Sequence, residues 1–270
     1  MLAVSDQPED AMTTDTAVHS RLKKSRANMR VEKFFAWCIA MAIALALAKC
    51  LPALAQSVPD KIPDNIEQRT MACIACHGKQ GQGSSGSIGS YVPRIAGKPA
   101  GYLYNQLVNF RDGRRQSQAM TYMVDHLSDA YLMEIAQYFA DLHVPYPDPH
   151  RTSSHDAQPA RGQTLVMLGD PSRNVPACIA CHGERLTGYA PAVPALIGLP
   201  QDYLNAQFGN WLNKTRRTAQ PDCMAQVVAR LSPADINAVS AWLAAQNVPA
   251  DSAPAMTLPN KMPLACGSVK

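Results

Sequence analysis

The hexapeptide Cys-Ile-Ala-Cys-His-Gly occurs twice in this chain of 270 residues, at positions 73–78 and 178–183. C-x-x-C-H is the attachment motif of c-type haem, because two thiols three positions apart can each bond one vinyl group of the same haem and the adjacent His then lies beneath the iron. The repeat therefore predicts two covalently bound haem c groups. The predicted attachment residues are Cys73, Cys76, Cys178 and Cys181, and the predicted iron ligands on one side are His77 and His182.

Two other kinds of site use similar residues. A structural zinc site needs four ligands gathered in one cluster. A thioredoxin-like redox pair has the C-x-x-C spacing but does not require the His that follows it in both copies. The repeated His therefore favours haem over both alternatives.

The N-terminal part of the chain has the pattern of a signal peptide. Residues 34–48 form an uncharged apolar run that follows Arg30 and Lys33 and precedes Ala-Leu-Ala at 53–55. A basic region, an apolar region and a small-x-small site are typical of an exported precursor. The alternative is an uncleaved membrane anchor, but the run is shorter than the roughly 20 apolar residues that span a bilayer. We expect cleavage after Ala55 and a mature protein in the periplasm.

Composition limits the classes of function. The hydrophobic content of 47% is ordinary for a globular protein. The formal net charge is only +4 and the basic residues form no cluster, so we expect no nucleic-acid binding. Once the signal peptide and the haem motifs account for six of the eight cysteines, Cys223 and Cys266 remain. An oxidising compartment favours a disulfide between them, with two free thiols as the alternative.

The repeat extends well beyond the haem motif. Past the motif, matching residues are 101 positions apart, and further along 104 positions apart, because the second copy contains a three-residue insertion. Two homologous domains, each with its own core, follow from a repeat of this length. The matches include Val92-Pro93 with Val193-Pro194, Gly97 with Gly198, Tyr102-Leu103 with Tyr203-Leu204, and Met120 with Met224.

Each copy is predicted to be helical. Helices are expected over 64–75, 100–110 and 128–142, and the last has apolar residues on one face. Its counterpart begins at Ser232, with Pro233 in the first turn. A proline-rich connector at 144–149 separates the copies. The expected architecture is all-α, with a signal peptide and N-terminal extension at 1–55 and tandem domains at 56–150 and 151–270, the second ending in a tail that wraps it.

The second axial ligand decides between electron transfer and catalysis, since a thioether closes the iron site whereas an open site binds small molecules. Met120 and Met224 occupy matching positions, whereas Met123 and His126 correspond to Val and Arg in the second copy. A single Met in a loop is more often part of a core. Two Met at matching positions predict that Met120 and Met224 are the second iron ligands.

Together these residues resemble the cytochrome c4 family, periplasmic di-haem proteins made of two class I cytochrome c domains. The resemblance covers most of residues 62–248 and rests on the paired haem motifs, the Pro-x-x-x-Gly segments, the Tyr-Leu pairs, the Arg-rich loop at 111–115 and Met120. It implies two helical cytochrome folds related by a pseudo-twofold axis, with His and Met ligands. It also implies that the carbonyl groups of Pro93 and Pro194 accept a hydrogen bond from the ligand imidazoles. The insertion, Cys223 and Cys266 depart from the family pattern.

The expected function is electron transfer without catalytic residues or a small-molecule substrate. The resemblance implies a quinol-oxidising complex or a dehydrogenase as donor, and a terminal oxidase or reductase as acceptor. Two alternatives remain. One is a cytochrome subunit bound permanently to a membrane dehydrogenase, and the other is a di-haem peroxidase, against which the matching Met positions argue.

Overall fold

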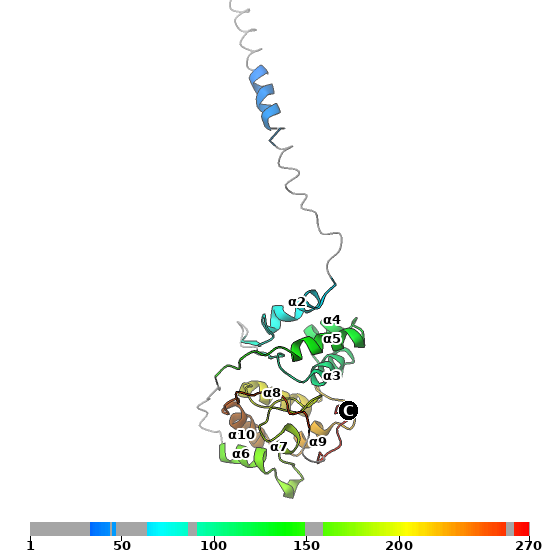
Figure 1. Ribbon diagram of the computed structural model, residues 1–270, viewed down its shortest axis with the longest axis vertical. Helices are drawn as coiled ribbons and strands as arrows, with labels where there is room; N and C mark the ends of the chain where they lie inside the picture. Colours follow the sequence, from blue (N-terminus) through cyan, green and yellow to red (C-terminus); the bar gives the residue numbers. More distant parts are fainter. Residues whose placement is uncertain are drawn as a thin grey trace, which may run out of the picture. The chain divides into compact units, whose positions relative to one another are not determined.

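The computed structural model describes residues 33–43, 45–46, 64–85, 91–148, 159–257 and 262–269 (Figure 1). The chain forms two compact units, residues 1–62 and 63–270. In the first unit, residues 33–43 are helical and their side chains are exposed. Within the described ranges, no helix is both long enough and apolar enough to cross a membrane. The predicted cleavage position after Ala55 and the connector residues 149–158 lie outside the described residues.

The second unit is helical, apart from a short antiparallel pairing of β1 (Ser84–Ser85) with β2 (Tyr91–Val92). The first copy contains α2 (Ile66–His77), α3 (Ala100–Arg111), α4 (Gln118–Val124) and α5 (Asp129–Ala140). The second copy contains α6 (Pro159–Met167), the 3-10 turn η1 (Pro171–Arg173), α7 (Ile179–His182), α8 (Gln201–Leu212), α9 (Cys223–Val228) and α10 (Pro233–Ala244). The two sets follow each other along the chain (Figure 1). The predicted all-helical tandem fold is confirmed.

Side-chain caps explain where several helices begin. Ser128 accepts from the backbone N–H of Tyr131, so the predicted helix over 128–142 is observed as α5. Ser232 and Asp235 form a reciprocal capping box, in which the Ser hydroxyl accepts from the Asp N–H (3.1 Å) and the Asp carboxylate accepts from the Ser N–H (3.0 Å). Each bond satisfies a backbone donor that has no partner within the helix. The predicted start of α10 is confirmed.

The two copies differ around the haem motif. Helix α2 runs without a break through the first motif, whereas the second copy divides the same region into α6 and α7. Pro171 and Pro176 lie between these two helices, where each lacks the N–H that a continuing helix needs. At Gly169 a Cβ atom would lie 2.4 Å from the Val175 carbonyl oxygen, so the loop folds back tightly. This interruption was not predicted from the sequence.

Each copy has its own apolar core. In the first copy, α3 and α5 bury Leu103, Ile135 and Phe139. In the second copy, α6 and α10 cross so closely that a Cβ atom at Gly162 would lie 2.2 Å from the Ala238 carbonyl oxygen. The core of the second copy lies around this crossing and extends to α8. Its buried apolar residues include Leu165, Val166, Leu204, Val239 and Leu243.

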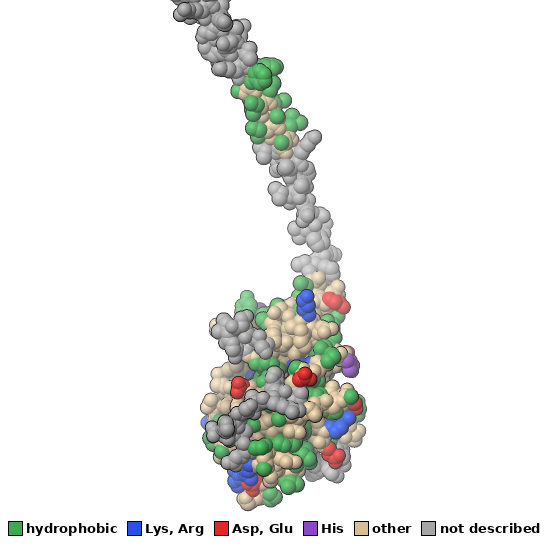
Figure 2. All heavy atoms as spheres, turned by 90° about the vertical axis from the view of Figure 1, so that its left-hand side faces the viewer, with side chains coloured by type: hydrophobic (Ala, Val, Ile, Leu, Met, Phe, Trp, Pro, Cys, Tyr) green, Lys and Arg blue, Asp and Glu red, His purple; other side chains and the backbone are tan. Residues whose placement is uncertain are grey.

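The two copies contact each other through equivalent loops. The Gln116 N–H donates to the Thr215 carbonyl (2.8 Å), and the Arg217 N–H donates to the Arg114 carbonyl (2.7 Å). Residues 116 and 217, and residues 114 and 215, are pairs at the repeat offset of 101. A rotation that interchanges the two copies therefore turns one hydrogen bond into the other, as expected for the pseudo-twofold relation that the family resemblance implies. On the face that Figure 2 shows, basic and acidic side chains are scattered.

Candidate haem sites

The two motif histidines are buried and oriented in the same way. The Nδ1–H of His77 donates to the Pro93 carbonyl oxygen at 2.7 Å, and that of His182 donates to the Pro194 carbonyl oxygen at 2.9 Å. Burial lowers the pKa of both imidazoles, so the neutral form is favoured. With Nδ1 protonated and engaged, Nε2 is left as the unprotonated atom that can bind a metal. This is the contact that the family resemblance implies.

A glycine ends each motif for a steric reason. Gly78 and Gly183 have φ angles of 85° and 87°, a region that favours glycine over all other residues. The helix therefore stops directly after the ligand His. The chain can then turn back and bring Pro93 or Pro194 to the imidazole.

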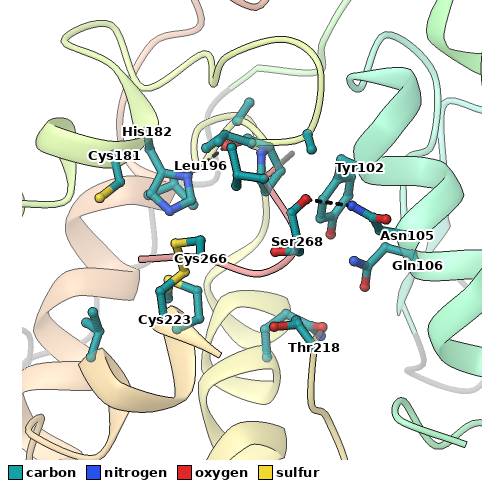
Figure 3. Close-up of a pocket in the computed structure, with 18 of the residues that line it drawn as sticks. Tyr102, Asn105, Gln106, Cys181, His182, Leu196, Thr218, Cys223, Cys266 and Ser268 are labelled. Atoms are coloured by element: carbon teal, nitrogen blue, oxygen red, sulfur yellow. Dashed lines mark hydrogen bonds between the residues drawn. A yellow bond between two sulfur atoms is a disulfide. The ribbon is translucent and has the colours of Figure 1, made fainter. Parts of the chain in front are cut away.

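An apolar cavity lies beside His182 in the second copy (Figure 3). Cys181, His182 and Met224 all line it, so the structure brings one predicted attachment cysteine, the ligand His and the thioether of this copy to one space. The other predicted attachment residue, Cys178, packs partly buried against the core of the second copy. Met224 is the second residue of α9, which Asp222 caps by accepting from the Ala225 N–H. The rest of the lining is largely aliphatic and aromatic and includes Leu196, Leu199, Leu204 and Phe208.

The first copy presents equivalent residues on equivalent elements. Cys73 lies in α2 and packs against the core of α3 and α5. Met120 lies in α4 and packs, partly buried, against the cluster of Phe110, Val124 and Leu132. Met123 is 40% exposed, and the side chain of His126 is 91% exposed. Burial therefore separates Met120 from the two nearby residues that lack a match in the second copy.

The alternatives to haem lack support in this geometry. Burial raises the pKa of Cys178 to about 12 and also raises that of Cys181, whereas a redox-active pair needs a readily formed thiolate. Within the part of the chain that the structure describes, no three His, Cys, Asp or Glu side chains gather as a metal cluster.

A polar cluster of Arg115, Arg216, Gln106 and Gln207 joins the two copies. Arg115 donates to Gln106 (2.9 Å) and across the interface to Gln207 (2.9 Å). Arg216 donates to Gln207 (2.6 Å) and across the interface to Gln106 (3.2 Å). These contacts follow the same pseudo-twofold relation as the backbone hydrogen bonds between the loops. From the sequence, Arg115 was expected only as part of an Arg-rich loop, and the other three residues were not predicted. The offset of 101 that relates Gln106 to Gln207 and Arg115 to Arg216 is the signal that could have revealed them.

The cluster carries positive charge without a carboxylate to balance it. Among the described residues, ion pairs form at the neighbouring Arg111 and Arg114, whereas Arg115 and Arg216 bond amides. Burial, and then Arg115, lower the pKa of Arg216. Burial would raise the pKa of Tyr102, but Arg216 and other nearby cations lower it to about 8.

These features fit haem. Within the described residues, the buried Nε atom of Arg216 and the buried indole Nε1 of Trp211 have no hydrogen-bond partner, and both residues line the cavity. Unpartnered buried donors are costly unless a ligand satisfies them. An apolar cavity with a cationic, donor-rich side suits a porphyrin that carries propionate groups. The predicted disulfide between Cys223 and Cys266 is also formed, and both cysteines line the same cavity.

Comparisons with known proteins agree with this geometry. The family model for cytochrome c matches residues 67–139 and 159–247. The chain is 38% identical over 176 residues to a thiosulfate dehydrogenase electron acceptor from Thiomonas intermedia, covering 65% of this chain and 78% of the relative. It is 31% identical to cytochrome c4 from Pseudomonas aeruginosa, covering 66% and 85%.

Solved structures show the same likeness. The structure of cytochrome c4 from Pseudomonas stutzeri matches with a TM-score of 0.54 and 28% identity, over 67% of this chain and 97% of that one. A thiosulfate dehydrogenase structure from Marichromatium purpuratum matches with a TM-score of 0.56 and 31% identity, over 65% of this chain. This chain spans only 36% of that second structure's chain. The predicted resemblance to cytochrome c4 is confirmed.

Proposed function

Because the chain belongs to the cytochrome c family and carries two haem c groups, we propose that it accepts single electrons from a periplasmic thiosulfate dehydrogenase and passes them to a terminal oxidase or reductase. The observation that carries the proposal is the equivalence of the two sites. Each copy bonds its ligand His to a Pro carbonyl, and each has a Met at the matching position of a short helix. The name of the Thiomonas relative supports the choice of donor.

The proposed iron ligands are His77 with Met120 in the first domain and His182 with Met224 in the second. Covalent attachment is assigned to Cys73, Cys76, Cys178 and Cys181. The shared cavity of His182 and Met224 supports the second pair. The match between α4 and α9 and the partial burial of Met120 support the first pair.

The bound haem supplies a one-electron couple between ferrous and ferric iron. The residues of the chain keep the surroundings of that couple fixed. The Pro93 and Pro194 carbonyls hold the imidazoles in one tautomer and orientation. Apolar side chains of the cavity exclude water, and Arg216 and Trp211 offer donors to carboxylates. The paired Arg and Gln side chains hold the two domains in contact.

Export to the periplasm is part of the proposal. Its support is the signal-peptide pattern, with cleavage after Ala55. The proposed domain limits are 56–150 and 151–270, and the two segments matched by the family model fall within them.

The donor is tested by mixing the oxidised protein with purified thiosulfate dehydrogenase and thiosulfate in a stopped-flow spectrophotometer. We expect reduction of both haems, seen as growth of the reduced α-band, only when dehydrogenase and thiosulfate are both present. If the dehydrogenase reduces an artificial acceptor under these conditions but leaves this protein oxidised, the proposed donor is wrong.

Permanent attachment to a dehydrogenase is the second candidate, because the Marichromatium structure that matches this chain is itself a thiosulfate dehydrogenase. Size-exclusion chromatography of the mixed proteins separates the two cases. A shuttle elutes apart from the dehydrogenase at low and high salt, whereas a subunit co-elutes at both.

A further inference from the structure

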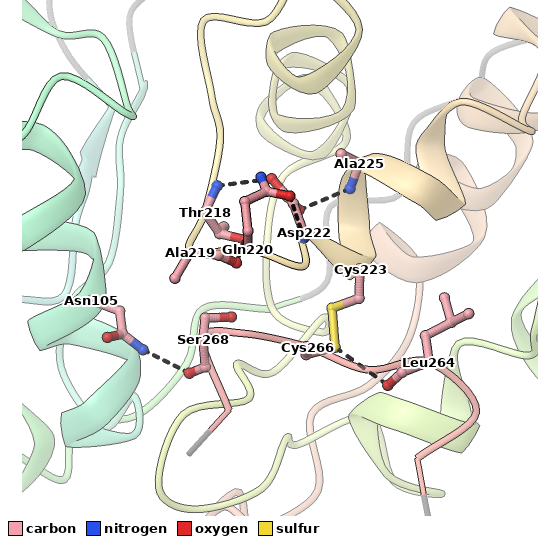
Figure 4. The surroundings of a disulfide bond; sticks show 10 residues. All are labelled: Asn105, Thr218, Ala219, Gln220, Asp222, Cys223, Ala225, Leu264, Cys266 and Ser268. Carbon is pink, nitrogen blue, oxygen red and sulfur yellow. Dashed lines mark hydrogen bonds between the residues drawn. A yellow bond between two sulfur atoms is a disulfide. The ribbon is translucent and has the colours of Figure 1, made fainter.

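The second domain has three features without a counterpart in the first. They are the inserted residues 218–220, Cys223 in place of Ala119, and the residues 262–269, here called the C-terminal strap. All three meet at one place in the structure (Figure 4). We propose that the C-terminal strap is a positioning element for the second haem, which holds Met224 on the iron and keeps other ligands out. This inference rests on the proposed role of Met224.

The strap lies directly on the inserted residues. The Gly267 N–H donates to the Pro221 carbonyl at 2.9 Å, immediately after the insertion. A Cβ atom at Gly267 would lie 2.2 Å from the Gln220 carbonyl oxygen and 2.7 Å from that of Ala219. No side chain fits this approach without displacing backbone. The insertion therefore forms the surface on which the strap rests.

The disulfide joins the strap to the residue that precedes Met224. Cys223 is the first residue of α9, and Cys266 lies next to Gly267 in the strap. Asp222 reinforces the same point, because its carboxylate accepts from the Ala225 N–H at 3.0 Å and from the Thr218 N–H at 2.8 Å. The start of α9 is thus fixed by a cap, by the insertion and by a covalent bond.

Among the described residues of the first domain, Met120 has no equivalent support. Helix α4 is capped by Ser117, and Ala119, the counterpart of Cys223, is exposed. Met120 is therefore held by the cap and by packing against the cluster of Phe110, whereas Met224 is also held covalently.

The strap also forms part of the cavity wall. None of its residues is charged, and those that line the cavity together with His182 are Met262, Leu264, Cys266, Ser268 and Val269. Its far end reaches the first domain, where the Asn105 side-chain amide in α3 donates to the Ser268 carbonyl at 2.8 Å (Figure 3). Residues 266–268 of the strap are thus held by both domains beside the cavity that Met224 lines.

Two consequences follow for the second haem. A ligand whose backbone is held in its bound position loses little conformational freedom on binding, so the bond is favoured over free ligands. An apolar wall that keeps water away disfavours the charged ferric site and so raises the reduction potential. Removal of the strap should therefore ease ligand exchange and lower the potential at this haem alone.

The test compares the mature holoprotein with the double variant Cys223→Ala, Cys266→Ala. Imidazole binding to the ferric protein is followed through the near-infrared band of Met-ligated haem, and both midpoint potentials are measured by spectroelectrochemistry. We expect imidazole to bind one haem at least tenfold faster. The potential of that haem should fall by about 59 mV, the one-electron equivalent of a tenfold change in equilibrium constant, and the other haem should not change.

Two further variants complete the test. Gly267→Ala leaves the cysteines in place but displaces the strap, so it should shift the same haem in the same direction even if the double variant does not fold. Ala119→Ser alters the matching position of the first domain and should change neither haem. If the wild-type protein shows two Met-ligated haems and neither strap variant changes rate or potential, the inference is overturned. If the wild-type protein shows only one, the proposed ligand assignment fails and this inference falls with it.

Discussion

The substitution Gly162→Ala tests how closely α6 and α10 pack. An added Cβ atom would lie 2.2 Å from the Ala238 carbonyl oxygen and 2.9 Å from Cβ of Trp242. Carbon and carbonyl oxygen approach to roughly 3.3 Å, so the helices would have to separate by roughly 1 Å. Both atoms that it meets belong to the backbone or the base of a side chain. Neither can move without moving α10.

The cost follows from what the separation opens. Leu165 and Val166 in α6 are 1% and 0% exposed, and a gap of this size removes about a quarter to a half of the attraction at each contact. Overpacking changes typically cost about 1–3 kcal/mol, and the helix gains roughly 1 kcal/mol when Ala replaces Gly. Because neither neighbour can give way, the upper end of the overpacking range applies, and we expect a net loss of about 2 kcal/mol in the free energy of unfolding.

Gly209→Ala in α8 is the matched control, because a Cβ atom there would have no neighbour within 4 Å. That variant should be more stable than the wild-type protein by roughly 0.5–1 kcal/mol. Urea unfolding followed by circular dichroism and by the Soret band measures both. If Gly162→Ala is as stable as Gly209→Ala, the close crossing of α6 and α10 is wrong.

Two more predictions concern the second domain. Burial would raise the pKa of Asp235, but hydrogen bonds from Arg173, Ser232 and Arg161 hold it well below its ordinary value. The stability it contributes is therefore present above about pH 4 and lost as the pH falls further. Asp235→Asn should lower the free energy of unfolding by about 2 kcal/mol, a loss that solvent screening of the partly exposed Arg161 and Arg173 keeps from being larger. The variant should also show a flatter dependence of urea unfolding on acid pH. The disulfide joins cysteines 43 residues apart, so replacing both with Ala should lower the free energy of unfolding by roughly 4 kcal/mol. Equal urea midpoints with and without the disulfide would contradict this estimate.

The sequence repeat was sufficient to predict much of the fold. Two haem motifs, matched Met positions and the capping residues Ser128 and Ser232 are local patterns, and local patterns have local physical causes. The observed helices α3, α5 and α10 lie within two residues of the predicted limits where these were given. The pairing of Cys223 with Cys266 was also expected, because few other cysteines remained.

Features that depend on tertiary contact were missed. The break between α6 and α7 is an exception, because Pro171 and Pro176 mark it locally in the sequence and only the tight fold of the loop at Gly169 depends on contacts. The exchange between Arg216 and Gln106 joins residues 110 positions apart. In the sequence, the insertion, Cys223 and the tail that contains Cys266 are three separate departures from the family pattern. Their meeting point depends on where the tail docks, which no local pattern specifies.

We propose that Met120 and Met224 close both irons, so that the haems transfer electrons without binding small molecules. The most direct test is the optical spectrum of the purified holoprotein, reduced with and without carbon monoxide, together with the near-infrared band of the oxidised form. We expect both haems to show the Met–iron band and carbon monoxide to leave the reduced spectrum unchanged. A haem that lacks this band or binds carbon monoxide readily would contradict it.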